Sequence, residues 1–350
     1  MRPEMNRTVK YFAILAGVAA SLSAAVSCTE MQPLEMQVNG AEKDYDAVRA
    51  FKATAHPLSV TWLPSWRADG AMDTYLSALP DSLDMVIVEA GYSELSHAQE
   101  TDLGSVRGTK GTKVIISVDF ETMASEYEEA VFQAEMDGED KAFEAASEND
   151  PDGEPTDEEI EAAVAVEMKK VEDEYTERFS SAADNAVAAV GRYAYDGILI
   201  KTGELPDEFY RSGVAAAVEK FSGAAGLLLL EGNVEYFLES FDRFDYLIST
   251  VVAQDRLSAY QEEYDRLSRN ENFDPAKYLV YLSLEESDCE TPYPDVISSL
   301  PLTDPKYKTL ALWNPAGGQP AGGLAVRCAS SDAFDGYGIL RKTIQYLQLK

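Results

Sequence analysis

Short apolar runs alternate with longer, helix-like stretches along most of the 350-residue chain. The apolar runs are continuous rather than alternating and contain β-branched or aliphatic residues, which is typical of parallel strands buried on both faces. Eight such runs fall at residues 58–63, 81–90, 112–118, 195–204, 226–231, 245–252, 277–284 and 324–329. With helices between them they predict an α/β fold, a single (β/α)₈ (TIM) barrel. An open doubly wound sheet fits less well, because no G-x-G-x-x-G follows the first run.

The longest interval lies between the third and fourth predicted strands. From Glu121 to Arg178 there are 22 Asp/Glu residues against 4 Lys/Arg, which is more than half of the formal net charge of −33. Alanine- and glutamate-rich sequence, and a capping box at 156–159 before apolar positions spaced by three and four, predict two helices. We therefore expect an inserted acidic helical hairpin over residues 121–181, its second arm continuing into a barrel helix.

The acidic turn of this hairpin faintly resembles a calcium loop, with carboxylates at 150, 152, 154 and 161. Pro155 stands where such a loop needs glycine, so a solvated acidic turn is favoured and no metal site is predicted.

The N-terminus has the order of an export signal. A basic segment precedes an apolar run from Tyr11 to Val26, and small residues lead to Cys28. This predicts a signal peptide over residues 1–28, and the cysteine is similar to a bacterial lipobox, in which Cys28 is lipidated. Ordinary secretion with an incidental Cys28 is the alternative. Residues 29–55 carry little periodicity and are predicted to be a tether, with the barrel at 56–350.

Charge, cysteine and histidine content exclude several classes of function. The strongly acidic chain repels nucleic acid and anionic membrane surfaces, whereas a neutral ligand such as a sugar is indifferent to that field. Cys289 and Cys328 form either a disulfide or two free thiols, and with only His56 and His97 beside them they make no zinc site. Neither histidine has a recognisable partner and no G-x-S-x-G elbow is present, which excludes a Ser-His-Asp hydrolase. No cofactor is predicted.

Charged residues end several predicted strands and should meet at one rim of the barrel, where such folds place their sites. Glu89, Asp119 and Glu231 each end an apolar run. If Lys201 points into the barrel, it needs one of these carboxylates or a water-filled pocket. We weigh an internal salt bridge evenly against a ligand-binding role for this lysine.

The fourth run, Tyr195–Glu204, reads Y-D-G-I-L-I-K-T-G-E. It resembles the signature strand of family 18 glycoside hydrolases (chitinases and endo-β-N-acetylglucosaminidases), D-G-x-D-x-D-x-E. Asp196 begins the match, but the next three carboxylate positions hold Leu199, Lys201 and Gly203. Shorter fragments in the same order, W-x-x-x-W, L-P-D-S-L-D, G-T-K-V-I, E-G-N and a final G-G, are similar to exported, lipoprotein-type family 18 proteins of gut Bacteroidetes. The sixth strand departs as well, with Thr-Val-Val at 250–252 where active relatives carry Gln and Tyr.

In that family the last glutamate of the motif protonates the glycosidic oxygen and the preceding aspartate orients the substrate acetamide. Leucine, lysine and glycine do neither, so the resemblance implies a non-catalytic, carbohydrate-binding barrel. The ligand that the resemblance implies is an N-acetylglucosamine-containing glycan of the N-linked type. The resemblance also implies that the protein is lipid-anchored to the outer membrane at the cell surface and passes the glycan to an uptake complex. The expected glycan-binding residues are Glu89, Tyr92, Asp119, Glu231, Asn233, Trp66 and Trp313.

Whether an aromatic residue is expected to bind a sugar or to pack in the core depends on its position. Aromatic faces stack on pyranose rings, but a tryptophan within a strand is more often part of the core. Trp62 is therefore expected in the core, and Trp66, beyond Pro64, is expected to be exposed.

Two alternatives remain open. The chain is either an active endo-β-N-acetylglucosaminidase that uses a relocated carboxylate, such as Glu204 or a rim residue of another strand, or a protein-interaction subunit of a glycan-uptake complex that uses the acidic hairpin. Glu204 lies one residue beyond the motif position, and within a strand such a slip turns the side chain to the opposite face.

Overall fold

A computed structural model of the chain describes residues 44–150, 152–223, 226–285, 288–295, 304–328 and 330–350. The predicted signal peptide, Cys28 and most of the predicted tether lie outside these residues and remain predictions. Residues Tyr45–Lys350 form one compact unit. Among the residues described, none of the helices combines the length and the apolar character that crossing a membrane requires.

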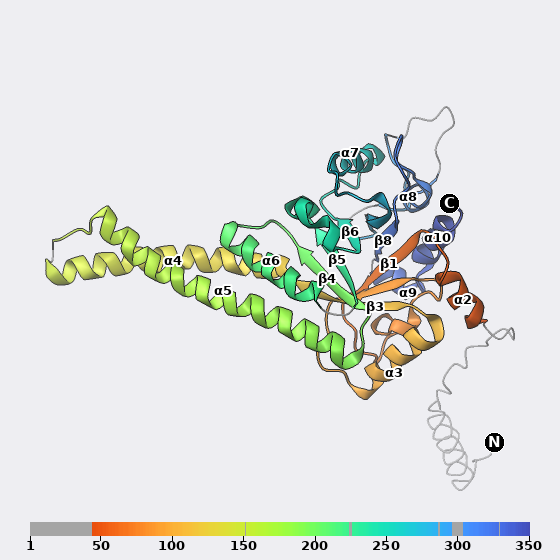
Figure 1. The fold of residues 1–350 in the computed structure, drawn as a ribbon, viewed down its shortest axis with the longest axis horizontal. Coiled ribbons are helices and arrows are strands. Elements are labelled where there is room, and N and C mark those ends of the chain that lie inside the picture. Colours follow the sequence, from red (N-terminus) through yellow and green to blue (C-terminus); the bar gives the residue numbers. More distant parts are fainter. Residues whose placement is uncertain (1–43, 151, 224–225, 286–287, 296–303, 329) are drawn as a thin grey trace, which may run out of the picture. The chain divides into compact units, whose positions relative to one another are not determined.

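Eight parallel strands close into a barrel in chain order, with β1 pairing with both β2 and β8 (Figure 1). The strands are β1 (Leu58–Leu63), β2 (Met85–Val88), β3 (Lys113–Asp119), β4 (Gly197–Thr202), β5 (Leu227–Gly232), β6 (Tyr246–Ser249), β7 (Tyr278–Ser283) and β8 (Gly323–Arg327). The predicted (β/α)₈ barrel is thereby confirmed, although β2 and β6 are shorter than the apolar runs that predicted them.

Helices surround this barrel: α2 (Tyr45–Lys52), α3 (His97–Ser105), α4 (Phe120–Asn149), α5 (Asp157–Tyr193), α6 (Glu208–Ser222), α7 (Leu257–Leu267), α8 (Lys306–Leu312), α9 (Ser330–Phe334) and α10 (Gly338–Leu347). A 3₁₀ segment, η4 (Val234–Arg243), follows β5 in place of a regular helix. Gly336 and Tyr337, with positive φ angles of 68° and 61°, separate α9 from α10.

The continuous apolar runs are explained by two cores, one inside the barrel and one between the barrel and its helices. In β4, Leu199 belongs to the inner core, whereas Ile198 and Ile200 pack against the helices. Successive strand residues face opposite sides. Position 201 therefore faces the interior, as do the positions paired with it, Asp119 in β3 and Glu231 in β5. This register brings charged strand ends together.

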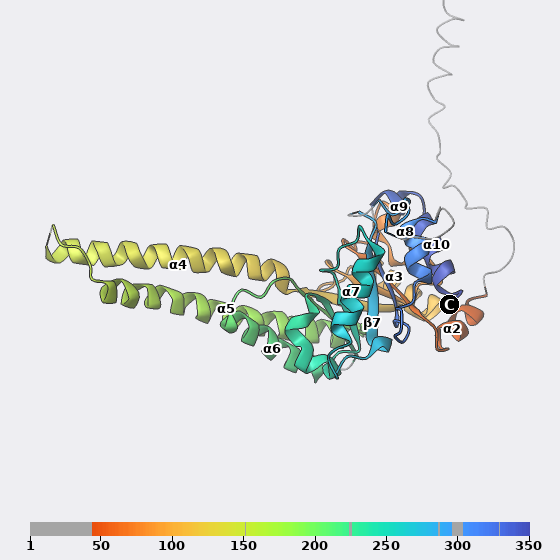
Figure 2. The same ribbon diagram turned by 90° about the horizontal axis from the view of Figure 1, so that it is seen from above.

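Helices α4 and α5 form a long antiparallel hairpin that extends from the barrel, seen side-on in Figure 1 and from above in Figure 2. The two helices pack closely: a Cβ placed on Gly138 would lie 2.5 Å from Val164 Cα. Near the barrel, the Tyr127 and Tyr175 rings lie 5.0 Å apart. Thr156 forms the predicted capping box at the start of α5. Both predicted helices are thus present; that they are an insertion into the family barrel remains a prediction.

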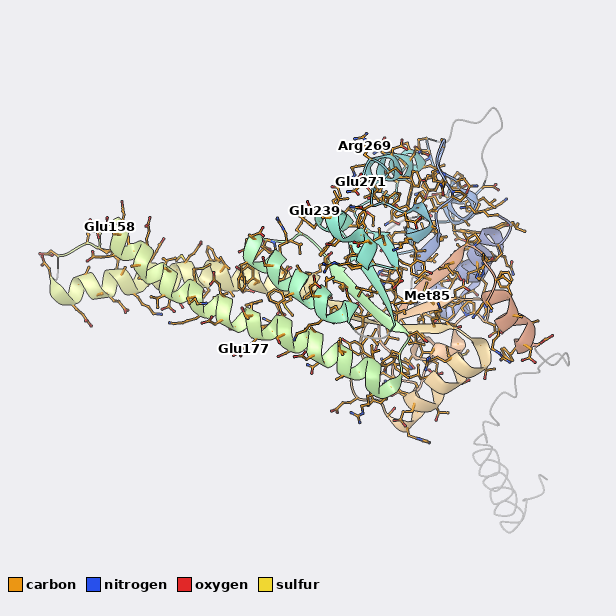
Figure 3. All side chains as sticks on the ribbon, viewed as in Figure 1. Met85, Glu158, Glu177, Glu239, Arg269 and Glu271 are labelled. Carbon is orange, nitrogen blue, oxygen red and sulfur yellow. The ribbon has the colours of Figure 1, made fainter. Side chains whose placement is uncertain are left out.

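The surface of this hairpin is strongly charged. Acidic side chains such as Glu158 and Glu177 point away from the paired helices into solvent (Figure 3). Helix α5 then continues without a break to Tyr193 and becomes the barrel helix that precedes β4.

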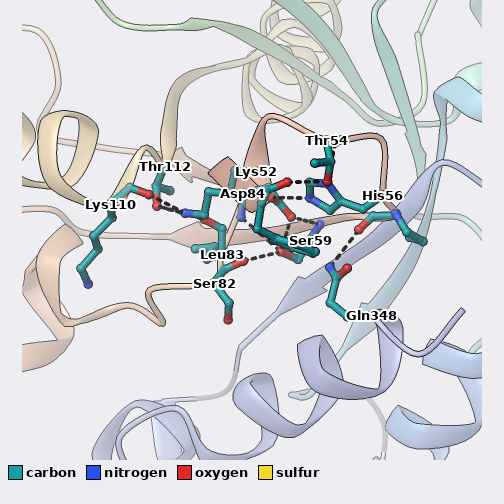
Figure 4. Close-up of polar contacts among 12 residues, drawn as sticks. Lys52, Thr54, His56, Ser59, Ser82, Leu83, Asp84, Lys110, Thr112 and Gln348 are labelled. Atoms are coloured by element: carbon teal, nitrogen blue, oxygen red, sulfur yellow. Dashed lines mark hydrogen bonds and ion pairs between the residues drawn. The ribbon is translucent and has the colours of Figure 1, made fainter. Parts of the chain in front are cut away.

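The end of the predicted tether is folded against the barrel, which corrects that prediction for residues 45–55. Lys52 of α2 donates hydrogen bonds to the carbonyl oxygens of Leu83 and Lys110 and to Thr112 Oγ1 (Figure 4). Burial lowers the pKa of Lys52 to about 8. A helix anchored by an ammonium group that donates to three buried oxygens is part of the domain.

His56 has a partner that sequence reasoning missed. Its Nε2 lies 2.9 Å from Asp84 Oδ1, and Asp84 Oδ2 accepts hydrogen bonds from the Ser59 backbone N–H and hydroxyl (Figure 4). Histidine and serine both bond to Asp84, which joins the chain before β1 to the loop before β2. Ser59 is the second residue of β1, at the end of the barrel opposite the C-terminal strand ends, so these contacts are structural.

Candidate functional site

Six charged side chains meet at the C-terminal ends of the strands, and we call them the mouth cluster: Glu89, Asp119, Glu121, Lys201, Glu231 and Arg327. The three strand-end carboxylates that the sequence predicted, Glu89, Asp119 and Glu231, are all among them. Arg327 and Glu121 were missed. Arg327 is a basic residue close to the end of the last apolar run, which is the signal that could have identified it. Glu121 is the first residue of the predicted acidic hairpin.

Arg327 of β8 joins two carboxylates on one side of the mouth. Its Nη1 lies 2.9 Å from Glu89 Oε1, and its Nη2 donates to Glu231 Oε1 at 3.0 Å. The guanidinium lies over the Trp62 ring, 4.6 Å from its centre, and the Trp62 indole N–H donates to Glu231 Oε2 at 2.9 Å. Trp62 is a buried core residue, as expected. Both oxygens of Glu231 are therefore occupied.

The Glu231 side chain is only 3% exposed. Burial raises the pKa of this carboxyl, while Arg327 and the Trp62 hydrogen bond act in the opposite direction. Burial by itself lowers the pKa of Arg327, but Glu231 and Glu89 raise it above its ordinary value. The arginine is therefore charged, and Glu231 serves as its buried counter-ion.

Lys201 of β4 organises the other side of the mouth. Its ammonium lies 2.8 Å from Glu121 Oε2 and 3.4 Å from Asp119 Oδ2, so the expected pair with Asp119 is present and a second partner is added. Burial acts to lower the pKa of Lys201, but these two carboxylates raise it overall. Asp119 also caps α4 by accepting a hydrogen bond from the Thr122 backbone N–H at 2.8 Å. The beginning of the hairpin is thereby attached to the mouth.

The three positions compared with the motif's carboxylates hold Leu199, Lys201 and Gly203. Leu199 is fully buried in the inner core. Lys201 is held by two carboxylates. A Cβ placed on Gly203 would lie 2.8 Å from Glu121 Cγ, so the Glu121 side chain fills the space beside the motif's last position. Asp196, at the start of the motif, makes a bidentate ion pair with Arg107 at 2.9 Å and lies at the other end of β4.

Glu204 lies beyond the end of β4 and is exposed to solvent. It accepts a hydrogen bond from the hydroxyl of Tyr236 in η4. None of the contacts described for Glu204 connects it to the mouth cluster. Asn233, which follows β5, uses its side-chain oxygen to cap η4 by accepting from the Glu235 backbone N–H at 3.3 Å.

Two aromatic residues that were predicted to bind the glycan, Trp66 and Trp313, lie away from the mouth cluster. Trp66 is 1% exposed, and its indole N–H donates to Asp102 Oδ2 at 3.0 Å, so the expectation that it is exposed is wrong. The chain turns inward after Pro64 and packs Trp66 beneath α3. Trp313 directly follows α8 and packs against Tyr260 and Tyr264 of α7. Helix α8 runs back towards the start of β8, so Trp313 lies at the end of the barrel away from the mouth.

A cleft of about 730 Å³ opens beside the mouth, between the loop after β2 and one face of α5. Three of the predicted glycan-binding residues, Glu89, Tyr92 and Asp119, line it. Burial, and to a lesser extent Asp119, raises the pKa of the half-buried Tyr92. Sequence reasoning missed the α5 wall, although small residues there recur at helical spacing.

The two remaining cysteines are free thiols: Cys289 is buried, and Cys328 lies 3.3 Å from Thr61 Oγ1. In the described part of the chain, His, Cys, Asp and Glu side chains do not form a group of three or more that could hold a metal ion.

Comparisons with known proteins identify the family and agree with the barrel fold. The sequence model of glycoside hydrolase family 18, BT1044-like, matches residues 22–205, which include β1 to β4 and the altered motif. No curated protein sequence matches the chain.

Solved structures show the same fold at low sequence identity. The apo endo-β-N-acetylglucosaminidase from Cordyceps militaris is 18% identical, with a TM-score of 0.55 over 88% of this chain and 96% of that chain. A BT1044 structure with a glutamate-to-glutamine substitution is 16% identical, with a TM-score of 0.58 over 87% and 91%. A mutant of the Cordyceps militaris enzyme in complex with fucosyl-N-acetylglucosamine-Asn is 17% identical, with a TM-score of 0.56 over 88% and 97%.

Proposed function

The chain belongs to glycoside hydrolase family 18, BT1044-like, and from this premise we propose that it binds a glycan without cleaving it. The proposed ligand is an N-acetylglucosamine-containing glycan of the N-linked type, held at the barrel mouth and in the adjoining cleft. We further propose that the protein is exported, is anchored through a lipid on Cys28 to the outer membrane at the cell surface, and passes its ligand to an uptake complex.

One observation carries the non-catalytic part of this proposal: Lys201 stands at a carboxylate position of the motif and pairs with Asp119 and Glu121. A general acid must hold a proton at the working pH, within hydrogen-bond reach of the leaving oxygen. Glu121, which fills the space beside Gly203, is paired with the Lys201 ammonium at 2.8 Å and is not directed at a site for a leaving oxygen.

The cleft supports binding. Its lining combines polar groups at the rim with the apolar surfaces of Val118, Met123 and the alanines of α5. Ligand sites are concave and join apolar walls to a few directed polar groups, and an aromatic ring such as that of Tyr92 can stack on a pyranose face.

The test measures binding and hydrolysis on the same purified protein. Calorimetry with released high-mannose and complex N-glycans should show binding, and a glycoprotein incubated with the protein should show no loss of mass. Tyr92→Ala should weaken binding about tenfold, the value of one good stacking contact. Tyr45→Ala, in α2, is the matched control and should leave binding unchanged.

Glycan release by the unaltered protein would overturn the non-catalytic proposal. The variants Glu204→Gln, Glu121→Gln and Glu231→Gln would then identify the acid, since only loss of the reacting carboxyl should abolish release. Absence of binding to every N-glycan would overturn the ligand assignment.

A second candidate function, a protein-interaction subunit, is favoured by the outer face of α4. Phe132, Met136 and Phe143 lie on the face turned away from α5 and are 63%, 44% and 48% exposed. Spacings of four and seven residues are typical of helices that insert into an apolar groove. Replacing all three residues by serine should abolish co-purification with the uptake complex in this case, and should change nothing if the hairpin has no partner there.

A further inference from the structure

We propose that the cleft ends in an anion subsite at Arg192, which binds the carboxylate of an acidic sugar, such as a sialic or uronic acid. This inference rests on the glycan binding proposed above and adds the chemical class of one end of the ligand.

The α5 wall of the cleft has the length and shape to hold a short sugar chain. Ala182, Asn185, Ala189 and Arg192 line it at spacings of three, four and three residues, which places them on one face of the helix. With a rise of 1.5 Å per residue, this face extends for about 15 Å, the length of roughly three sugar residues. The alanines leave room for a ligand to lie close to the helix.

The two ends of the cleft differ in chemistry. At the mouth end, Asp119 and Glu89 are already paired with Lys201 and Arg327. The far end is formed where the loop after β2 meets the C-terminal part of α5. Two hydrogen bonds fix this junction: the Tyr195 hydroxyl donates to the Tyr92 carbonyl at 2.9 Å, and the Leu95 backbone N–H donates to the Tyr193 hydroxyl at 3.1 Å.

Arg192 is the only basic residue among those that line the cleft in the described structure. Its guanidinium lies over the Tyr193 ring, 4.9 Å from the centre, which limits its orientations. No ion pair joins it to a carboxylate of the described residues, although the chain has 62 acidic residues for 29 basic ones. A planar guanidinium that is not paired with a described carboxylate offers two parallel N–H donors, which match the two oxygens of a carboxylate ligand.

The position of Arg192 in the last turn of α5 has a structural explanation, because a cation there is favoured by the helix dipole. The dipole does not explain why the residue lines a cleft together with the Ser93 hydroxyl and the Asn185 amide, which can also donate to an anion. Glu94 lines the same cleft and opposes an anionic ligand, so its removal should strengthen binding.

The experiment compares one glycan in two forms. Calorimetry on the full purified protein uses a biantennary N-glycan with terminal sialic acid and the same glycan after desialylation. We expect the sialylated form to bind about tenfold more tightly, the effect of one charge-assisted bidentate contact. Arg192→Ala should abolish this preference, so that the two glycans bind with equal affinity. Arg192→Lys should restore part of it, and Glu94→Gln should increase it.

Arg269→Ala removes an exposed arginine outside the cleft and should leave both affinities unchanged. Equal affinity of the unaltered protein for the two glycans would overturn the anion subsite while leaving glycan binding in place. A preference that survives in Arg192→Ala would place the anion elsewhere and also overturn it. If neither glycan binds, the proposed function and the subsite fail together.

Discussion

The variant Arg327→Met tests whether the mouth cluster is a closed, buried ion-pair network. Arg327 is the cation shared by Glu89 and Glu231, and methionine replaces most of its aliphatic stem without the charge. The substitution therefore leaves the carboxylate of Glu231 buried and without its counter-ion, while the Trp62 hydrogen bond stays in place.

The expected loss follows from the burial of Glu231. Removing one partner of a buried ion pair destabilises a protein by about 3–5 kcal/mol, because the other charge is left uncompensated. The cation–π contact with Trp62 contributes about 0.5–2 kcal/mol more. We expect the free energy of unfolding to fall by roughly 4 kcal/mol at about pH 8, a large part of the 5–15 kcal/mol typical of a domain.

The loss should depend on pH in a defined direction. Burial already raises the pKa of Glu231, and without Arg327 that pKa rises further. A carboxyl that keeps its proton in the folded state, where the unfolded chain has released it, makes stability fall as pH rises. The difference between the unaltered protein and Arg327→Met should therefore be small near pH 4.5 and reach its full size at about pH 8.

Urea unfolding at both pH values, followed by tryptophan fluorescence, measures this difference. The double variant Glu231→Gln/Arg327→Met should recover much of the loss at pH 8, because it removes the stranded charge. Arg243→Met, which breaks an exposed pair with Glu219, is the control and should have no measurable effect. A loss below about 1 kcal/mol at pH 8, or an equal loss at both pH values, would show that Glu231 is not held as argued.

Three further predictions concern the core, a strand end and the hairpin. Trp66→Ala should lower the free energy of unfolding by about 3–5 kcal/mol, because the residue is in the core, and should leave the glycan affinity measured by calorimetry unchanged. Weakened binding with unchanged stability would instead show that Trp66 contacts the glycan. Gly232→Ala should lower the free energy of unfolding, measured in urea, by at least about 3 kcal/mol, because φ is +119° and a Cβ would lie 1.5 Å from the Thr202 carbonyl oxygen. Unchanged stability would show that the two backbones do not lie this close together. Replacing residues 135–167 by a short glycine-serine loop should leave the glycan affinity measured by calorimetry unchanged, because the mouth cluster and the α5 wall of the cleft remain. Loss of binding in a protein that still folds would show that the outer part of the hairpin contributes to the site.

The local pattern of the sequence determined the barrel and the position of its mouth. Continuous apolar runs separated by helices specify parallel strands in chain order, and a side-chain period of two then fixes which residues face inward. This pattern is sufficient to place Glu89, Asp119, Lys201 and Glu231 at one rim. The residues on which the non-catalytic proposal rests, Leu199, Lys201 and Gly203, are likewise visible in the sequence alone.

Only the tertiary structure decided the partners of those residues and the walls of the cleft. Trp62 and Glu231 are 169 residues apart in sequence, and Arg327 and Glu231 are 96 apart; both contacts exist because the barrel closes. Burial of Trp66 and the position of Trp313 depend on how α3 and α8 pack against the strands. Local periodicity does not indicate which residues far apart in the sequence will meet. Ion pairing and burial are set by elements that come together only when the chain has folded.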